Sequence, residues 1–372
     1  MDKPTAEESK LLTRVMTLGS ATALPVLISR FELARLIGVI YFDTNSGQQL
    51  EDINPGLWKQ INPEQEYYAT PGQWFQQEFD LAPLAHFELM RFGNQHIPDF
   101  NTYLKCLSEL HKRRRKYAMI LSAQPIPTMV QVSPRSLIEY GEMNSEALAS
   151  WLTWRKFFYD LDNRSAQETG YLFEPILAAA IGGEPKGAKS RVVTRSGDAA
   201  KGRQVDCWKV TPDGRRLAYE FKLRVTIAAS GQGRFGEEIQ FAQDCKSSGA
   251  VPILLVLDPT PNSRLDDLAS AFRGAGGSAF VGDAAWRHLE EEAGETMARF
   301  IERYVRCPIV DVSSYEGERA NREVKNSKGL LDFSARIQND DVAFSFGSHV
   351  RLIKRREDPK LSDELQDQKP GE

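Results

Sequence analysis

The sequence predicts an α/β fold in which an αβββαβ core, a mixed sheet flanked by helices, follows a mainly helical N-terminal region. Two observations support this prediction. After residue 165, short strand-like runs alternate with helix-like runs, which is typical of α/β proteins. Before residue 163, apolar residues recur at helical spacing, as in "SEALASWLTWRKFFYDLDN".

The composition indicates a globular protein of ordinary kind. The chain has 372 residues, 41% hydrophobic and 26% charged, and this length allows a sizeable core and two or three domain-sized units. No apolar run approaches the roughly 18–20 residues of a membrane span, so we expect no membrane association. The four cysteines lack any paired spacing, which argues against zinc and disulfides and fits a reducing cytoplasm. The net charge of −4 leaves a nucleic-acid partner open, because phosphates respond to local basic surfaces.

We divide the chain into five parts. Residues 1–19 are expected to be a flexible N-terminus, 20–163 a mainly helical region, and 164–310 a catalytic core. Residues 311–353 form a C-terminal extension with one more strand in "AFSFGSHVRLI", and the charged tail 354–372 is expected to be disordered. The basic run "HKRRRK" at 111–116 is interpreted as a solvated helix face, with contact to DNA backbone phosphates as the alternative.

Within the core, the elements follow one another with clear boundaries. A helix in "SAQETGYLFEPILAAAIGG" ends at Gly182-Gly183, and strands are predicted in "KSRVVTR", "RQVDCWKV" and "RLAYEFKLRV". A helix in "GEEIQFAQDCKSSG" precedes the apolar strand "VPILLVLD". The helix "SRLDDLASAFRGAGG", the strand "SAFVG" and the long helix "DAAWRHLEEEAGETMARFIERYV" complete the core.

The turn in "RQVDCWKVTPDGRRLAYEFKLR" determines which side chains of this predicted hairpin face one another. A two-residue loop would send Asp206 and Glu220 to opposite faces. A three-residue loop, Pro212-Asp213-Gly214, places proline at the second position of a type I turn and glycine in the left-handed position after it. We therefore predict the three-residue loop, with Asp206 opposite Glu220.

This register divides the hairpin into two faces. One face, the apolar side of a half-buried sheet, would hold Val205, Cys207, Leu217, Tyr219, Phe221 and Leu223. The other face would bring together Asp206, Glu220 and Lys222, with Trp208 and Ala218 toward the turn. Opposed carboxylates repel each other unless a cation lies between them, and Mg²⁺ prefers such oxygen ligands. The alternative is a solvated face on which Lys222 forms an ordinary salt bridge.

Glu174 adds a carboxylate within the apolar helix "YLFEPILAAAIGG", where a charge is rarely buried without a partner. A helix, three strands, a helix and a strand, with Asp206 on the second strand and Glu220-x-Lys222 on the third, resembles the Mg²⁺-dependent nucleases of the PD-(D/E)XK superfamily. The chain departs from that pattern at Val205, where the superfamily often has proline.

Three longer segments resemble the ApaLI-type family of type II restriction endonucleases. The similarity runs from about Arg113 to Glu290 and includes "RRRKYAMILSAQPIPTMVQVSPRSLIEYG", "DNRSAQETGYLFEPILAAAIGG" and "YEFKLRVTIAASGQGRFGEEIQFAQDCKSSG". It implies a restriction-endonuclease-like core that cleaves double-stranded DNA within a short palindrome, GTGCAC for the family's namesake, and leaves 5′-phosphate ends. It also implies a Mg²⁺ cofactor, a prokaryotic cytoplasm and a homodimer, because a two-fold protein best matches a two-fold site.

The resemblance assigns roles to the hairpin residues. Asp206 and Glu220 would hold the metal, with Glu174 as a further carboxylate at or beside it. Lys222 would position the attacking water or help to deprotonate it, and would offset charge on the phosphate. The helical N-terminal region would wrap the DNA, form the dimer interface, or do both.

Residues around the hairpin are candidates for DNA contacts. Gln232 and Arg234 lie in a Gly-rich loop, and these side-chain types pair with adenine and guanine, although a plain connector is an equal alternative. The basic segment 186–203 leads into the site and suggests contacts with phosphates. The candidates are Gln232, Arg234, Arg224, Lys189, Arg191, Arg195 and Arg203.

Other functions remain compatible with the sequence. "GQGRFG", Gly231 to Gly236, matches a dinucleotide-binding fingerprint and would suit a nucleotide-binding oxidoreductase. However, Glu237 and Glu238 in the first turn of the next helix would repel a pyrophosphate, so we expect no dinucleotide cofactor. A second alternative, within the same fold, is a structure-selective repair or recombination nuclease. A third alternative is a non-catalytic DNA-binding module.

Overall fold

The structure is a computed structural model that describes residues 4–18, 24–129, 134–169, 173–222, 234–258, 263–316 and 328–357. The chain forms two compact units, and each unit combines segments that are distant in sequence. Unit 1 contains residues 29–108 and 172–310, and unit 2 contains residues 5–28, 109–171 and 311–372. None of the helices in these described ranges is long and apolar enough to cross a membrane.

A five-stranded mixed sheet forms the centre of unit 1, with strand order β3-β6-β7-β8-β9. The strands are β3 (Glu184–Lys186), β6 (Val205–Val210), β7 (Arg216–Lys222), β8 (Val251–Val256) and β9 (Ser278–Val281). β7 pairs antiparallel with β6 and parallel with β8, and β8 pairs parallel with β9. The predicted α/β class with a mixed sheet is therefore confirmed.

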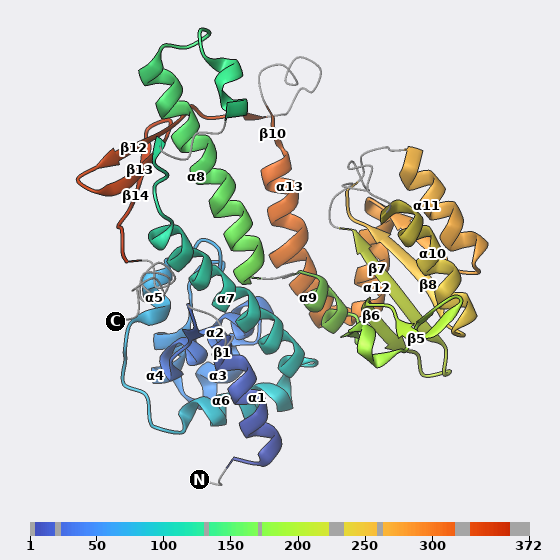
Figure 1. Ribbon diagram of the computed structural model, residues 1–372. Helices are drawn as coiled ribbons and strands as arrows, with labels where there is room; N and C mark the ends of the chain where they lie inside the picture. Colours follow the sequence, from blue (N-terminus) through green and yellow to red (C-terminus); the bar gives the residue numbers. More distant parts are fainter. Residues whose placement is uncertain are drawn as a thin grey trace, which may run out of the picture. The chain divides into compact units, whose positions relative to one another are not determined.

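Helices cover both faces of this sheet (Figure 1). On one face lie α10 (Arg234–Ser247) and α11 (Ser263–Gly274), and on the other lie α9 (Phe173–Ala180) and α12 (Asp283–Ile301). Ala218 packs in the α10/α11 cluster, while the ring of Tyr219 lies 5.8 Å from that of His288 on α12. Both residues are completely buried, so the prediction of a half-buried sheet was wrong. Successive side chains of β7 point alternately to the two faces of the sheet, and helices cover both faces.

The first strand of the sheet also differs from the prediction. The segment "KSRVVTR" was expected to supply it, but the edge strand is the shorter β3, residues 184–186. The segment "KSRVVTR" instead begins in η3 (Ala188–Ser190) and ends in β4 (Thr194–Arg195), which pairs with β5 (Asp198–Gly202) in a separate two-stranded sheet. This hairpin leaves the main sheet between β3 and β6.

Unit 1 also contains helices from the N-terminal region. These are α2 (Arg30–Asp43), α3 (Gly47–Ile53), α4 (Pro55–Ile61), α5 (Gly72–Gln76), α6 (Ala85–His96) and the start of α7 (Phe100–Ala123). The buried carboxylate of Asp43 accepts hydrogen bonds from the hydroxyls of Tyr103 (2.7 Å) and Tyr304 (2.6 Å) and from Arg303 (3.0 Å). Tyr304 and Arg303 belong to the π-helical turn η4 (Glu302–Arg306), which follows α12 and precedes α13 (Cys307–Ser313). Helices on both sides of the expected boundary at residue 163 therefore share this unit.

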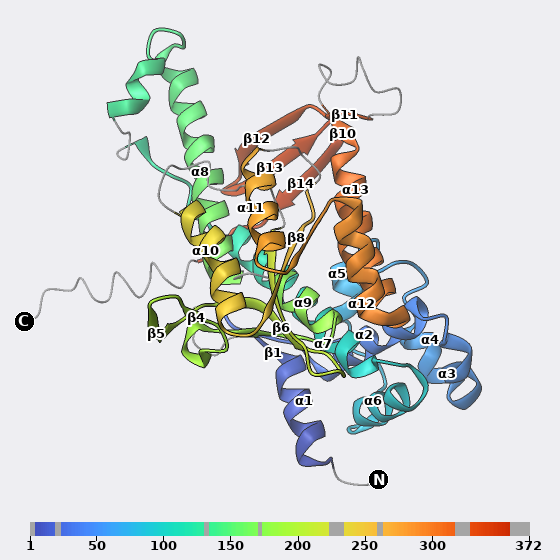
Figure 2. The same ribbon diagram turned by 90° about the vertical axis from the view of Figure 1, so that its right-hand side faces the viewer.

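Unit 2 contains two elements that the sequence analysis missed. Residues 6–16, within the segment predicted to be flexible, form α1 (Ala6–Met16), because Thr5 and Glu8 form a reciprocal capping box at its start. The predicted single C-terminal strand is a three-stranded antiparallel sheet of β12 (Phe333–Gln338), β13 (Asp341–Phe346) and β14 (His349–Ile353), shown in red in Figure 2.

The remaining elements of unit 2 are the end of α7, η2 (Pro134–Glu139), α8 (Ser145–Thr169) and four two-residue strands: β1 (Thr17–Leu18), β2 (Val26–Leu27), β10 (Tyr315–Glu316) and β11 (Lys328–Gly329). Its core joins side chains of α7 and α8 to the C-terminal sheet, namely Ile120, Leu121, Phe157, Leu161, Val342, Phe344 and Ile353.

The basic run on α7 is not a solvated helix face, as had been predicted. Lys112 is completely buried, and its Nζ donates to the carbonyls of Arg14 (2.7 Å) and Thr17 (2.9 Å) and pairs with Glu109 (2.6 Å). His111 and Lys116 are buried as well. The ammonium of Lys112 thus binds carbonyl groups at the C-terminal end of α1, where helices favour positive charge.

Candidate active site

The β6–β7 hairpin has the predicted three-residue loop. The amide of Thr211 donates to the carbonyl of Arg215 (3.0 Å), and the amide of Gly214 donates to the carbonyl of Thr211 (2.8 Å). Gly214 has a φ of +83°, the left-handed conformation that the loop requires. The ladder runs in the predicted register up to the pair Cys207–Tyr219 and ends there, one position before Asp206 and Glu220.

A bulge in β6 changes the faces next to Asp206. Against β3, Trp208 pairs with Glu184 but Val205 pairs with Lys186, so β6 contains one more residue than its partner over this stretch. Val205 consequently packs in the same cluster as Ala218. The prediction that Val205 shares a face with Tyr219 was therefore wrong, because the bulge interrupts the two-residue alternation.

The carboxylate of Asp206 lies against the neighbouring strand. Its Oδ2 accepts a hydrogen bond from the backbone amide of Phe221 (3.0 Å). Burial, followed by the charge of Glu220, raises the pKa of Asp206 to about 8, and the charge of Glu174 acts in the same direction. Burial and Glu220 also raise the pKa of Glu174 on α9. We refer to Asp206, Glu220 and Glu174 as the acidic cluster, since their charges act on one another at short range.

Lys222 lies beside the acidic cluster, between two carboxylates. Its Nζ is 2.8 Å from Oε1 of Glu220 and 3.0 Å from Oε1 of Glu238 on α10. Burial disfavours the ammonium form, but the charges of Glu220 and Glu238 outweigh it, so the pKa of Lys222 is raised. Lys222 therefore carries a positive charge at neutral pH.

The acidic cluster is suited to a cation with few protein ligands. Among the described residues, no three His, Cys, Asp or Glu side chains are already arranged around one metal position. Mg²⁺ needs only one or two carboxylates in proteins, because water and phosphate oxygens supply its remaining ligands. Two opposed carboxyls with mutual repulsion, one of them largely protonated at neutral pH, provide such a partial set.

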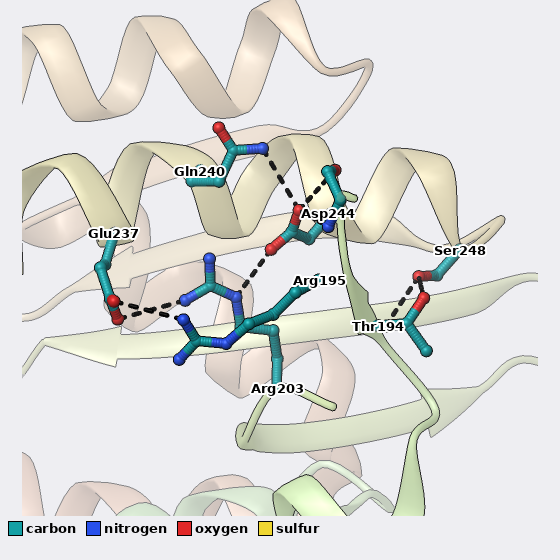
Figure 3. A network of polar contacts seen from close by, with 8 residues as sticks. Thr194, Arg195, Arg203, Glu237, Gln240, Asp244 and Ser248 are labelled. Atoms are coloured by element: carbon teal, nitrogen blue, oxygen red, sulfur yellow. Dashed lines mark hydrogen bonds and ion pairs between the residues drawn. The ribbon is translucent and has the colours of Figure 1, made fainter. Parts of the chain in front are cut away.

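The β4–β5 hairpin is attached to α10 by a polar network centred on Asp244 (Figure 3). The completely buried carboxylate of Asp244 accepts hydrogen bonds from Nε of Arg203 (2.7 Å), from the amide and hydroxyl of Ser196 (2.8 and 2.6 Å) and from Gln240 (3.2 Å). Hydrogen bonds from these groups outweigh the effect of burial and lower the pKa of Asp244. This network gives Arg203, whose side chain is only 10% exposed, a structural part in the fold.

A basic cavity of about 510 Å³ lies in the same hairpin region. It is lined by Ala188, Lys189, Arg191, Arg195, Ala200, Lys201 and Gly202, and four of these seven side chains are basic. Arg195 pairs with Glu237 (3.3 Å) and Lys201 with Asp198 (3.1 Å). The structure thus brings the candidates Lys189, Arg191 and Arg195 together around one hollow, whereas Arg203 is held by Asp244.

A comparison with known proteins matches this chain to the model of an ApaLI-like restriction endonuclease family over residues 49–306. The chain belongs to the ApaLI-like restriction endonuclease family. It is 57% identical over 364 residues to the "Type II restriction enzyme ApaLI" of Acetobacter pasteurianus, and the alignment covers 96% of each chain. The predicted type II restriction endonuclease, a site-specific deoxyribonuclease, is confirmed at the level of the family. No solved structure matches the chain significantly.

All seven candidate DNA contacts in this family member remain predictions, and the side chains of three of them lie outside the described residues. Arg224 and Gln232 lie outside the described residues, and Arg234 begins α10 but its side chain is also outside them. The "GQGRFG" loop falls largely on the same segment. β7, the strand before this loop, pairs antiparallel with β6, which argues against the parallel sheet of a dinucleotide-binding fold.

Sequence reasoning missed two acidic residues of the site, both on α10. Glu238 was considered only as a charge at a helix N-terminus. Asp244 was not considered, although it lies between the buried residues Phe241, Ala242 and Cys245 in helical spacing. A carboxylate among buried positions of a helix is the signal that could have identified it.

Proposed function

We propose that this restriction endonuclease family member is a Mg²⁺-dependent enzyme that cuts both DNA strands within a short palindrome and leaves 5′-phosphate ends. The observation that supports this most directly is the acidic cluster beside Lys222 on adjacent strands of the hairpin. Burial, followed by the charges of Glu220 and Glu174, raises the pKa of Asp206 to about 8, and the charge of a bound divalent cation would favour the ionised carboxylate.

In this proposal Asp206 and Glu220 hold the Mg²⁺ ion, and Glu174 is the third carboxylate at or beside it. When bound, the ion would polarise the scissile phosphate and acidify the attacking water. The bulge in β6 and the amide of Phe221 hold the Asp206 carboxylate in place beside Glu220. The chain itself therefore supplies a fixed pair of oxygen ligands.

The role of Lys222 follows from its protonation state. Because its pKa is raised, Lys222 retains its proton at neutral pH and is a poor base for the attacking water. Of the two roles expected from the sequence, its charge suits positioning the water and stabilising negative charge on the phosphate during in-line attack. This attack would leave a 3′-hydroxyl opposite the 5′-phosphate.

The basic cavity supports contacts with the DNA backbone. Lys189, Arg191 and Arg195 line a hollow large enough for a phosphate group, and such contacts would position the duplex without reading its sequence. The proposal also includes a contact of Arg203 or Arg224 with DNA, and base contacts by Gln232 and Arg234.

Palindromic recognition supports a homodimer, in which each copy cuts one strand. We propose GTGCAC as the recognition sequence from the family resemblance, and the prokaryotic cytoplasm as the site of action. We assign the helical N-terminal region to DNA wrapping, to the dimer interface, or to both.

A plasmid-cleavage assay tests this function. Two plasmids that differ only in one GTGCAC site are incubated with the protein and Mg²⁺, and the products are resolved and end-labelled. We expect one double-strand cut, with 5′-phosphate ends, only in the plasmid that carries the site, and no cutting by Asp206→Ala, which should still bind DNA. Cutting at a different fixed sequence would reject GTGCAC alone. Cutting at branched or damaged DNA without sequence preference would favour the structure-selective nuclease, and an active Asp206→Ala would refute the site.

A further inference from the structure

The position of Lys222 depends on two carboxylates from different elements. Glu220 lies two residues away on the same strand, whereas Glu238 lies on α10, the helix that covers this face of the sheet. The three side chains are 19%, 20% and 22% exposed for Lys222, Glu220 and Glu238 respectively. Both ion pairs are therefore largely shielded from water, and shielded ion pairs are stronger than ion pairs at the surface.

The contact of Glu238 is not that of an ordinary surface charge near a helix N-terminus. The adjacent Glu237 has the same charge, is 59% exposed and pairs with Arg195 and Arg203, so α10 already has a carboxylate in its first turn that does not contact Lys222. Glu238 instead turns inward, and its Oε2 is buried without a hydrogen-bond partner among the described residues. A buried unpaired carboxylate oxygen is unfavourable for folding, which indicates that Glu238 is kept at this position for another reason.

A metal ion in the acidic cluster would change the surroundings of Lys222. The proposed function gives the oxygens of Glu220 to Mg²⁺, and the divalent charge would then repel the neighbouring ammonium. Glu238 is the second carboxylate already in contact with Nζ of Lys222. It lies on a separate helix, so its contact with Lys222 does not require the oxygens of Glu220.

We propose that Glu238 is a positioning residue, which anchors the Lys222 ammonium next to the scissile phosphate when the metal binds Glu220. This inference rests on the proposed function and adds a fourth acidic side chain to the reaction site. Glu238 acts through Lys222 and makes no contact of its own with the phosphate.

The test combines kinetics and stability for Glu238→Gln, Lys222→Met, the double variant, and Asp267→Asn as a control. Asp267 is an exposed acidic residue on α11, so its variant removes the same charge from a neighbouring helix. The cleavage rate is measured in single turnover with excess protein and Mg²⁺. DNA affinity is measured with Ca²⁺ in place of Mg²⁺, and thermal unfolding without divalent ions.

We expect Glu238→Gln to lower the single-turnover rate by about 10–100-fold, with DNA affinity unchanged within about two-fold. In the Lys222→Met background, Glu238→Gln should cause little further loss of rate. The decrease in Tm of the double variant should be smaller than the sum of the two single decreases, because the two residues interact. Asp267→Asn should behave as the wild type in each assay.

Three results would overturn the inference: a wild-type rate for Glu238→Gln, an equal loss of rate with and without Lys222, or additive decreases in Tm. If the wild-type protein cuts DNA and loses cutting in Asp206→Ala, these results reject the anchor alone. If the wild-type protein does not cut, the proposed function fails and the anchor fails with it.

Discussion

Replacing Asp206 with asparagine should change how the stability of the metal-free protein depends on pH. The pKa of Asp206 is about 8 in the folded protein, against an ordinary value of 3.8. Between these values the folded state keeps a proton that the unfolded state releases. Folding stability from this group is therefore complete below about pH 4, declines as the pH rises, and is lost above about pH 8.

The size of the effect follows from the same pKa values. One pKa unit corresponds to about 1.4 kcal/mol, so the full loss is at most roughly 6 kcal/mol. Glu174 also has a raised pKa and repels the same charges. Only part of the titration of Asp206 falls between pH 6 and pH 8.5, so we expect a loss of about 2–3 kcal/mol of folding stability over this range. This corresponds to a decrease in Tm of roughly 5–10 °C.

Thermal unfolding in EDTA, followed by calorimetry from pH 5.5 to pH 8.5, measures this dependence. Asp206→Asn removes the buried ionisable group, so its Tm should exceed that of the wild type by an amount that grows with pH. Asp267→Asn, an exposed control, should show the wild-type slope. Parallel pH curves for Asp206→Asn and the wild type would refute the reasoning that burial and the neighbouring charges disfavour the Asp206 carboxylate in the metal-free protein.

Three further predictions test the proposed metal site and the proposed DNA contacts of the β4–β5 hairpin. Divalent metal binding should release about one proton per chain near pH 7, because the acidic cluster must ionise to hold the ion. Calorimetry in two buffers of different ionisation enthalpy should detect this proton, and a binding heat that is independent of the buffer would count against the proposed ligands. Asp244→Ala should destabilise the protein by about 3–5 kcal/mol in urea unfolding, because it leaves the buried guanidinium of Arg203 without its carboxylate. Asp198 pairs with Lys201 at the surface, so Asp198→Ala should cost less than about 1 kcal/mol, and equal losses for the two variants would contradict this prediction. Gly202→Ala should weaken DNA binding in Ca²⁺ and lower the Tm, because the added Cβ would lie 2.0 Å from the carbonyl oxygen of Ala188. Gly187→Ala serves as the control, since its added Cβ would have no atom within 4 Å. The same affinity for both variants would show that the basic cavity tolerates the clash.

Several features of the site could be predicted because they depend on local chemistry. The Pro212-Asp213-Gly214 loop has one turn geometry that suits its residues, and this geometry sets the register of the hairpin as far as the pair Cys207–Tyr219. The Glu220-x-Lys222 spacing then follows from the two-residue period of a strand. The main elements of the core, such as β8 and α11, were predicted from their apolar patterns for the same reason.

Other features depend on contacts between segments that are distant in sequence. The bulge that turns Val205 to the face of Ala218 arises from pairing with β3, a strand whose three residues carry almost no strand pattern. The C-terminal sheet escaped prediction because its burial depends on α7 and α8. α1 has a local signal in the Thr5–Glu8 capping box, which the prediction did not use.

The sequence by itself determined the family and the loop of the hairpin, because motifs and turns are encoded within a few neighbouring positions, and it proposed Asp206, Glu220 and Lys222 as site residues. Only the tertiary structure placed α10 over the face that carries Lys222, brought Glu238 to its ammonium, and joined Arg203 to Asp244. Packing between helix and sheet selects these contacts, and no local pattern specifies which polar side chains will meet in such an interface.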